Sequence, residues 1–258
     1  MMADMPDRKI ILKFLFLSLL AGSFLFLALG CNGGSTSTSA STQTRTSEAD
    51  YNPKIVPGDF VDKIDNKYYP LIPGTTFVYE GKTGDGAERN EVTVTSDTKV
   101  ILGVKCVVVH DKVTVEGKLK EETYDWYAQN KDGSVWYFGE DAKSYENGRV
   151  TSTSGSWEAG RNDAKPGIIM KANPARGDSW RQEFRKGEAE DMAEVIALNE
   201  PATVPAGTFQ GCIKTKDWTP LEPKIEENKL YCPVAGVVSS KMVKGGSDSM
   251  QLVEIRKG

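Results

Sequence analysis

The chain has 258 residues and a net charge of −4, with 39% hydrophobic and 26% charged residues. This balance is ordinary for a globular protein and excludes disorder through most of the chain. Lysine and arginine side chains are interspersed with acidic ones along the body, so no basic stripe is available for a run of phosphates. We therefore expect no nucleic acid partner.

The first 30 residues have the layout of an export signal. Arg8, Lys9 and Lys13 precede an apolar run over residues 14–29. A helix of that length spans roughly 24 Å, which is short of the roughly 30 Å hydrocarbon core of a bilayer. We predict a removable signal peptide over residues 1–30 and rank a permanent transmembrane helix below it.

Residues 27–31 read Leu-Ala-Leu-Gly-Cys and resemble the lipobox of bacterial lipoproteins. The resemblance implies that the thiol of Cys31 is acylated and that Cys31 becomes the new N-terminus. Two or more acyl chains hold a protein stably on a bilayer. Asn32 follows, where an aspartate favours retention in the inner membrane. The resemblance thus implies anchoring to the outer membrane of a cell with two membranes, or otherwise to the outer face of the plasma membrane.

Residues 31–50 are rich in serine and threonine and contain no aromatic residue. Such a segment buries too little apolar surface to offset the entropy of ordering it. We interpret it as a flexible tether, which would hold the rest of the protein about 25 Å from the membrane.

Residues 51–258 are predicted to form a single β-rich domain. Period-two alternation recurs in ten or more short runs, such as 91–95 and 104–109, between clusters of Gly, Pro, Asn and Asp. We predict a mainly β fold with one antiparallel, strongly curled sheet, an incompletely closed barrel with long loops. A β-sandwich is the alternative. Residues 149–178 form either a long crossover loop or strands that the pattern misses, and residues 187–193 form at most one helical turn.

The clearest predicted hairpin joins residues 124–128 to residues 135–138 through a turn that contains Gly133. Its alternation places aromatic side chains on both faces of the ribbon. Together with Trp157 these side chains define a candidate apolar groove for a lipid, a sugar or an extended peptide: Trp126, Trp136, Tyr137 and Phe138. The alternative, which we favour, is that they fill the core.

Several segments of the body resemble a group of bacterial secreted proteins: residues 66–81, 125–140, 205–209, 218–223 and 236–238. The group brings no known activity. It is loosely similar to small periplasmic proteins with curled, incompletely closed antiparallel sheets, which favours that architecture over a flat sandwich. In this comparison Cys232 stands where alanine is more usual.

Three cysteines remain after Cys31 in a chain that we expect to enter an oxidising compartment. Cys212 and Cys232 lie on consecutive predicted strands, close to positions that face each other, so a disulfide between them is reasonable. Cys106 lies in an apolar strand and competes for Cys212. Plain buried thiols are the alternative to a disulfide.

The sequence contains no recognisable catalytic, cofactor or metal motif. The one histidine, His110, is four residues from Cys106 on the same predicted strand, which is too far for a catalytic pair. Neither the Asp132-Gly133 turn nor the acidic cluster at residues 188–191 has the spacing of a calcium loop, and we interpret the cluster as a solvated acidic edge. We expect no metal and no cofactor.

Two classes of function are consistent with these features. The favoured one is a membrane-anchored, non-catalytic envelope lipoprotein that binds a hydrophobic ligand or a protein partner. The rival is a carbohydrate-active hydrolase that uses a carboxylate pair. Two carboxylates roughly 5 to 10 Å apart at the floor of an aromatic cleft would favour the hydrolase.

Overall fold

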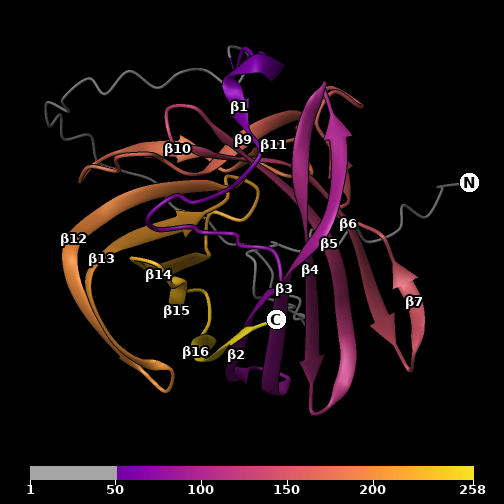
Figure 1. Cartoon of the computed structure of the whole chain (residues 1–258). Helices are drawn as coiled ribbons and strands as arrows, with labels where there is room; N and C mark the ends of the chain where they lie inside the picture. The colour runs from indigo at the N-terminus through magenta and orange to yellow at the C-terminus, as the bar shows by residue number, and fades with distance from the viewer. Residues whose placement is uncertain (1–50) are drawn as a thin grey trace, which may run out of the picture.

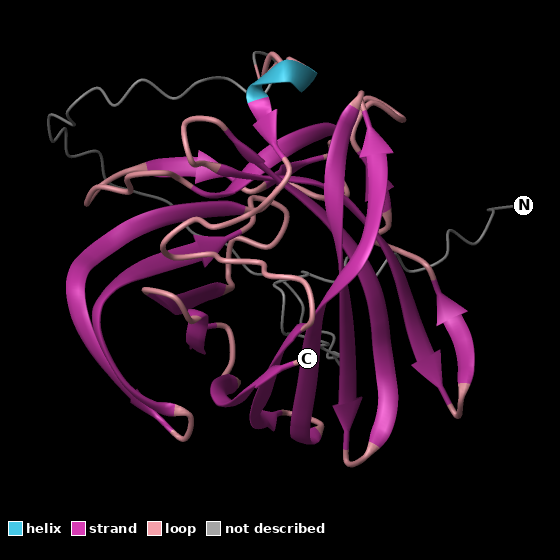
Figure 2. Cartoon of the chain, in the orientation of Figure 1, coloured by secondary structure: helices cyan, strands magenta, loops and turns pink. Residues whose placement is uncertain are grey.

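The computed structural model describes residues 51–258, and nearly all of this part of the chain is β structure (Figure 1, Figure 2). The predicted signal peptide, Cys31 and the predicted tether lie outside the described residues. A single 3-10 turn, Pro57–Asp59, precedes the first strand. Within residues 51–258, no helix has the length and hydropathy needed to cross a membrane.

The strands follow one another in the chain as β1 (Phe60–Val61), β2 (Thr75–Thr83), β3 (Gly86–Ile101), β4 (Val104–Val115), β5 (Lys118–Asn130), β6 (Val135–Glu146), β7 (Arg149–Ser152), β8 (Trp157–Glu158), β9 (Lys165–Met170), β10 (Ser179–Arg181), β11 (Glu183–Phe184), β12 (Met192–Val204), β13 (Gly207–Trp218), β14 (Glu226–Cys232), β15 (Gly236–Lys244) and β16 (Ser249–Lys257).

These strands build one antiparallel sheet that curls into a nearly closed barrel. The order runs β10, β12 to β16, β2 to β6, β9 and β11, so β10 and β11 are its two ends. Gln182 alone separates these two strands in the chain, and the barrel therefore has one unsealed seam at this residue. The predicted curled sheet is confirmed, and the β-sandwich alternative does not apply because the strands form one continuous sheet.

The predicted aromatic hairpin is confirmed as β5 and β6, and Gly133 adopts a φ of 95° in its turn. Residues 149–178 hold β7, β8 and β9, so the second of the two interpretations of this segment is correct. Their short lengths explain why alternation did not reveal them. Residues 187–193 form no helix, because the chain turns back to pair Ala189 with Arg185.

The segment between β1 and β2, residues 62–74, crosses the inside of the barrel and is here called the plug (indigo in Figure 1). The Asn66 amide nitrogen donates hydrogen bonds to the carbonyl oxygens of Gly133 (2.8 Å) and Lys171 (3.2 Å). The Gln129 Oε1 atom accepts hydrogen bonds from the backbone of Asp65 (2.9 Å) and Asn66 (2.8 Å). These bonds satisfy the side-chain amides of Asn66 and Gln129, which are both buried.

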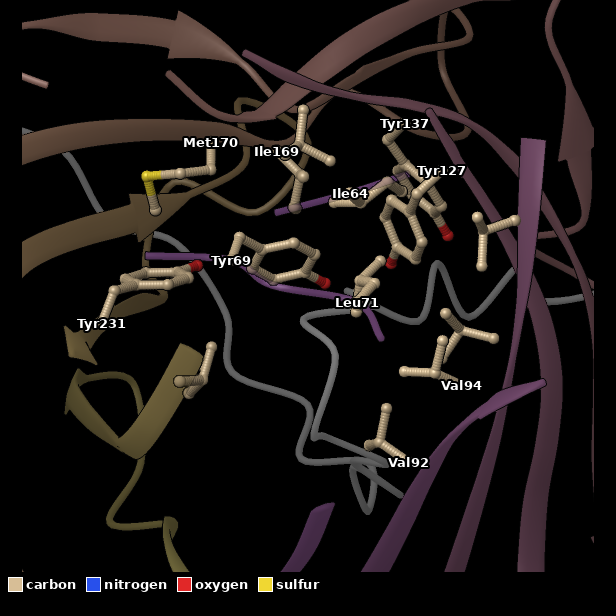
Figure 3. Close-up of a cluster of buried hydrophobic side chains, with 14 of the residues drawn as sticks. Ile64, Tyr69, Leu71, Val92, Val94, Tyr127, Tyr137, Ile169, Met170 and Tyr231 are labelled. Carbon is tan, nitrogen blue, oxygen red and sulfur yellow. The ribbon is translucent and has the colours of Figure 1, made fainter. Parts of the chain in front are cut away.

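Apolar side chains of the plug and the barrel wall pack together to form the main core (Figure 3). Tyr69 of the plug meets Tyr127 of β5 edge to face, with ring centroids 5.6 Å apart, which is within the usual range of about 4.5 to 7 Å for such pairs. Tyr127 stacks on Tyr137 at 4.7 Å. Ile64 and Leu71 pair through a bridge inside the plug. The core therefore fixes the plug against the hairpin that the sequence singled out.

Candidate functional site

The five aromatic residues predicted to line a groove lie on two different faces of the sheet. Register pairs Tyr127 with Tyr137 and Ala128 with Trp136, so Tyr137 faces the barrel interior while Trp126 and Trp136 face outward. The Trp157 ring meets Tyr137 at 5.2 Å inside the barrel. The structure thus brings the rings of Tyr137 and Trp157 into contact, whereas Trp136 and Phe138 both pack against Phe60 of β1.

The outward tryptophans are covered by other parts of the chain. The Trp126 ring is 7% exposed and the Lys99 ammonium lies 3.3 Å from its centroid. Trp136 packs edge to face against Phe60 of β1, with centroids 6.5 Å apart. Trp126 and Trp157 border one surface hollow. Two of the charged side chains that line it, Lys99 and Arg161, form ion pairs with a third, Glu158. The rings themselves offer little surface to a ligand.

An apolar cavity lies between the plug and the barrel wall. It encloses about 360 Å³, part of it open to solvent. The residues that line it come from the plug, β2, β3 and the start of β15: Tyr69, Pro70, Leu71, Phe77, Tyr79, Val92, Ala235, Gly236 and Val237. The hydroxyl group of Tyr79 donates a hydrogen bond to the Val237 carbonyl (3.0 Å), so its polar atom is satisfied and the ring presents an apolar surface.

A second cavity, here called the acidic cavity, lies further along the barrel interior and encloses about 500 Å³, part of it open to solvent. Its lining shares no residue with the apolar cavity and consists of Asp111, Glu121, Thr123, Asp125, Tyr137, Glu140, Ile169, Gln182, Glu183, Asp191 and Lys229. The two interior aromatics lie against its carboxylates: the Tyr137 hydroxyl donates to Asp125 (2.6 Å) and the Trp157 Nε1 donates to Glu183 (3.1 Å).

Carboxylates enter the barrel because they stand in phase with its inward apolar residues. On β4, Asp111 follows Val107 and Val109 at two-residue spacing, and all three are buried. Ten carboxylates are buried in the described part of the chain: Glu88, Asp111, Asp125, Glu140, Glu183, Glu190, Asp191, Asp217, Glu227 and Asp248. Among residues 51–258, Lys229 is the one buried lysine or arginine. Its ammonium lies 3.1 Å from Asp217 and 3.4 Å from Glu227.

Burial raises the pKa of several of these carboxyl groups and so favours their neutral forms. It raises the pKa of Asp191 to about 8, although the Lys229 charge acts against the rise. It raises the pKa of Glu88 to about 8 as well, with a further contribution from Asp248. The pKa of Asp111 lies well above its usual value because of burial and the nearby charge of Asp125. Groups of this kind hold or release protons near neutral pH.

Cys212 and Cys232 are joined by a disulfide in the structure. They stand opposite each other on β13 and β14, with Cα atoms 4.1 Å apart. Cys106 lies on β4 as a free buried thiol, and burial raises its pKa to about 12. A thiol with so high a pKa is a poor nucleophile at neutral pH.

The other candidates from the sequence lie apart from both cavities or enter them only in part. The His110 ring stacks on Tyr124 and bonds to Glu122 at 3.0 Å on the outer face. Of the acidic cluster at 188–191, Glu188 pairs with Arg185 (2.7 Å), whereas Asp191 lines the acidic cavity. In the described part of the chain, no three histidine, cysteine or carboxylate side chains are arranged to hold a metal ion.

Sequence analysis did not single out Asp111, Glu121 or Lys229 as site residues. The signal was present for Asp111, which occupies an inward position in an alternating apolar strand. Lys229 likewise alternates with Glu227 and Tyr231 on β14. What the alternation could not reveal is that β4 and β14 face the same cavity, because that depends on the closure of the barrel.

No protein-family model matches the chain, and no curated protein sequence matches it. Two solved structures are similar to it. One is an inferred exported protein with a YmcC-like fold from Bacteroides fragilis, 16% identical, with a TM-score of 0.45, covering 74% of this chain and 100% of that chain. The other is an inferred lipoprotein from Parabacteroides distasonis, 16% identical, with a TM-score of 0.42, covering 74% of this chain and 99% of that chain.

Proposed function

We propose that the protein is a non-catalytic envelope lipoprotein that binds a small hydrophobic ligand. The observation that carries the proposal is the apolar cavity between the plug and the barrel wall. Small-molecule sites are concave, mostly apolar and few in each protein. The cavity is narrow and lined mainly by apolar side chains, so it suits a slender, uncharged apolar ligand.

The location follows from the N-terminal sequence. The Leu-Ala-Leu-Gly-Cys segment supports lipid attachment at Cys31, and the tether over residues 31–50 supports a barrel held away from the membrane surface. The membrane is then the first partner of the protein, through its lipid anchor. A small apolar ligand shed by or delivered to that membrane would lie within reach of the barrel.

Isothermal titration calorimetry with 1-octanol, an uncharged apolar probe, tests this binding. The full-length chain is purified in a mild detergent, and the same detergent is present in the probe solution. Ala235 is 1% exposed and lines the cavity, so Ala235→Leu should fill it and weaken binding at least tenfold. Its neighbour Val234 is 82% exposed, and Val234→Leu is the matched control that should leave binding unchanged.

If Ala235→Leu does not fold, Val92→Ile makes a smaller change in the same cavity. Saturable binding that only the cavity variants weaken supports the proposal. An absence of saturable binding, or equal binding by all variants, overturns it, and a protein partner would then be sought by crosslinking in the envelope.

A carbohydrate-active hydrolase is the second candidate, and one observation favours it. Asp125 and Glu140 stand directly opposite each other on β5 and β6, beside Tyr137 in the acidic cavity. Cleavage of 4-nitrophenyl glycosides by the wild-type chain, lost in Asp125→Asn, would establish this alternative. No cleavage across a panel of such substrates would dismiss it.

A further inference from the structure

The two sides of the acidic cavity differ in how their carboxylates are neutralised. On one side, the Lys229 ammonium lies within 3.4 Å of both Asp217 and Glu227. On the other side, the charges that act most strongly on Asp111 belong to Asp125, Glu121 and Glu140, which are all carboxylates. The positive charge of Lys229 therefore offsets the carboxylate charges on one side of the acidic cavity.

Asp111 lies on the second side, and one of its carboxyl oxygens lacks a hydrogen-bond donor. Its side chain is buried, with 5% of the residue exposed, and it lines the cavity. The Asn90 amide bonds to the carboxyl group, yet the Oδ1 atom of Asp111 has no hydrogen-bond partner. A buried acceptor without a donor costs about 1 to 3 kcal/mol, and more where it is charged. An N–H donor with a positive charge is the group that would satisfy it best.

The rest of the lining restricts the shape of that donor. The Ile169 side chain and the ring of Tyr137 border the same cavity as Asp111, so an apolar wall lies beside the carboxylates. A chain of methylene groups fits against such a wall, while ammonium groups at intervals along it reach the carboxylates. Lys229 itself has this construction, with a methylene stem and an ammonium head between two acidic side chains.

We propose that the acidic cavity binds a small linear oligoamine, whose ammonium groups pair with Asp111 and the neighbouring carboxylates Glu121 and Glu140. This site is distinct from the one in the proposed function, because the two cavities share no lining residue.

Spermidine is the probe, titrated calorimetrically into the full-length chain in mild detergent at 150 mM NaCl. Asp111→Asn removes the carboxyl group whose Oδ1 atom lacks a partner, and with it the charge that an ammonium group would stabilise, so it should weaken binding at least tenfold. Asp97→Asn makes the same change of charge at an exposed position outside the cavity and should leave binding unchanged. Glu140→Gln is the second cavity variant if Asp111→Asn does not fold.

Saturable spermidine binding that Asp111→Asn weakens and Asp97→Asn does not supports the site. Equal effects of the two variants would overturn it, because they would show attraction by net charge alone. Calcium that binds the same chain and displaces spermidine would overturn it in favour of a metal site. Loss of octanol binding in Ala235→Leu with spermidine binding intact would show that the two sites are independent.

Discussion

Around the plug, the inward side chains of β4 and β5 are apolar, whereas next to them on the same two strands lie inward carboxylates. Val107 and Val109 give way to Asp111, and Tyr127 gives way to Asp125. Burial of the apolar part supplies most of the free energy of folding. Burial of the acidic part lowers stability unless a proton or a cation neutralises it. The apolar part of the barrel interior therefore stabilises the fold, whereas the acidic part depends on a neutralising proton or cation.

Removal of the Lys229 charge should produce the largest change, because it leaves Asp217 and Glu227 without their buried cation. Lys229→Met is expected to lower the free energy of unfolding by about 3 to 5 kcal/mol in urea denaturation at pH 7. Lys216→Met is the control, since the ion pair of Lys216 with Glu194 (2.7 Å) is one-third exposed and should contribute under about 1 kcal/mol. Equal losses in both variants would contradict an acidic part that depends on Lys229.

The stability of the apolar part around the plug should depend on the volume of its buried side chains. Leu71 of the plug is 5% exposed, whereas the adjacent Ile72 is 50% exposed. Leu71→Ala is expected to lower the free energy of unfolding by about 2 to 4 kcal/mol, because it removes buried methyl groups and leaves a cavity. Ile72→Ala should have less than half that effect. If the two variants unfold alike, the plug does not pack into the core as described.

A loss of stability with rising pH should come from buried carboxyl groups such as that of Glu88 on β3. The pKa of Glu88 is about 8 in the folded state, against 4.5 for an ordinary glutamate. Between these values the folded chain holds a proton that the unfolded chain releases, so the free energy of unfolding falls as pH rises from about 4.5 to about 8. Glu88→Gln should reduce this fall by on the order of 2 kcal/mol.

Urea denaturation of the wild-type and Glu88→Gln chains at pH 5 and pH 8 measures this difference. Leu71→Ala serves as the comparison, since it should lower stability equally at both pH values. An unchanged pH slope in Glu88→Gln would show that Glu88 ionises freely in the folded chain.

The alternation of apolar and polar residues predicted much of the fold, because side chains on the buried face of a strand recur at every second residue. The β5 and β6 hairpin was predictable from its aromatic residues and Gly133, and the sheet curvature from the many short strands. The two-residue strands β8 and β11 are too short to show a period. The seam at Gln182 depends on which strands end the sheet, and that order arises from long-range pairing.

The candidate sites were less predictable than the fold. Tyr137 and Trp157 were singled out as aromatic, and both prove to contact carboxylates, which no spacing indicated. Leu71, Val92 and Ala235 come together only because the plug enters the barrel. A sequence pattern shows which face a residue takes on its strand, whereas a cavity depends on which faces meet.

Native mass spectrometry of the full-length chain, purified from the envelope without refolding, tests the central claim that the apolar cavity of the barrel carries a removable small molecule. The account predicts an added mass on the wild-type chain and on Val234→Leu that disappears on denaturation and is absent from Ala235→Leu. The same mass for native and denatured wild-type protein, or an added mass retained by Ala235→Leu, would contradict it.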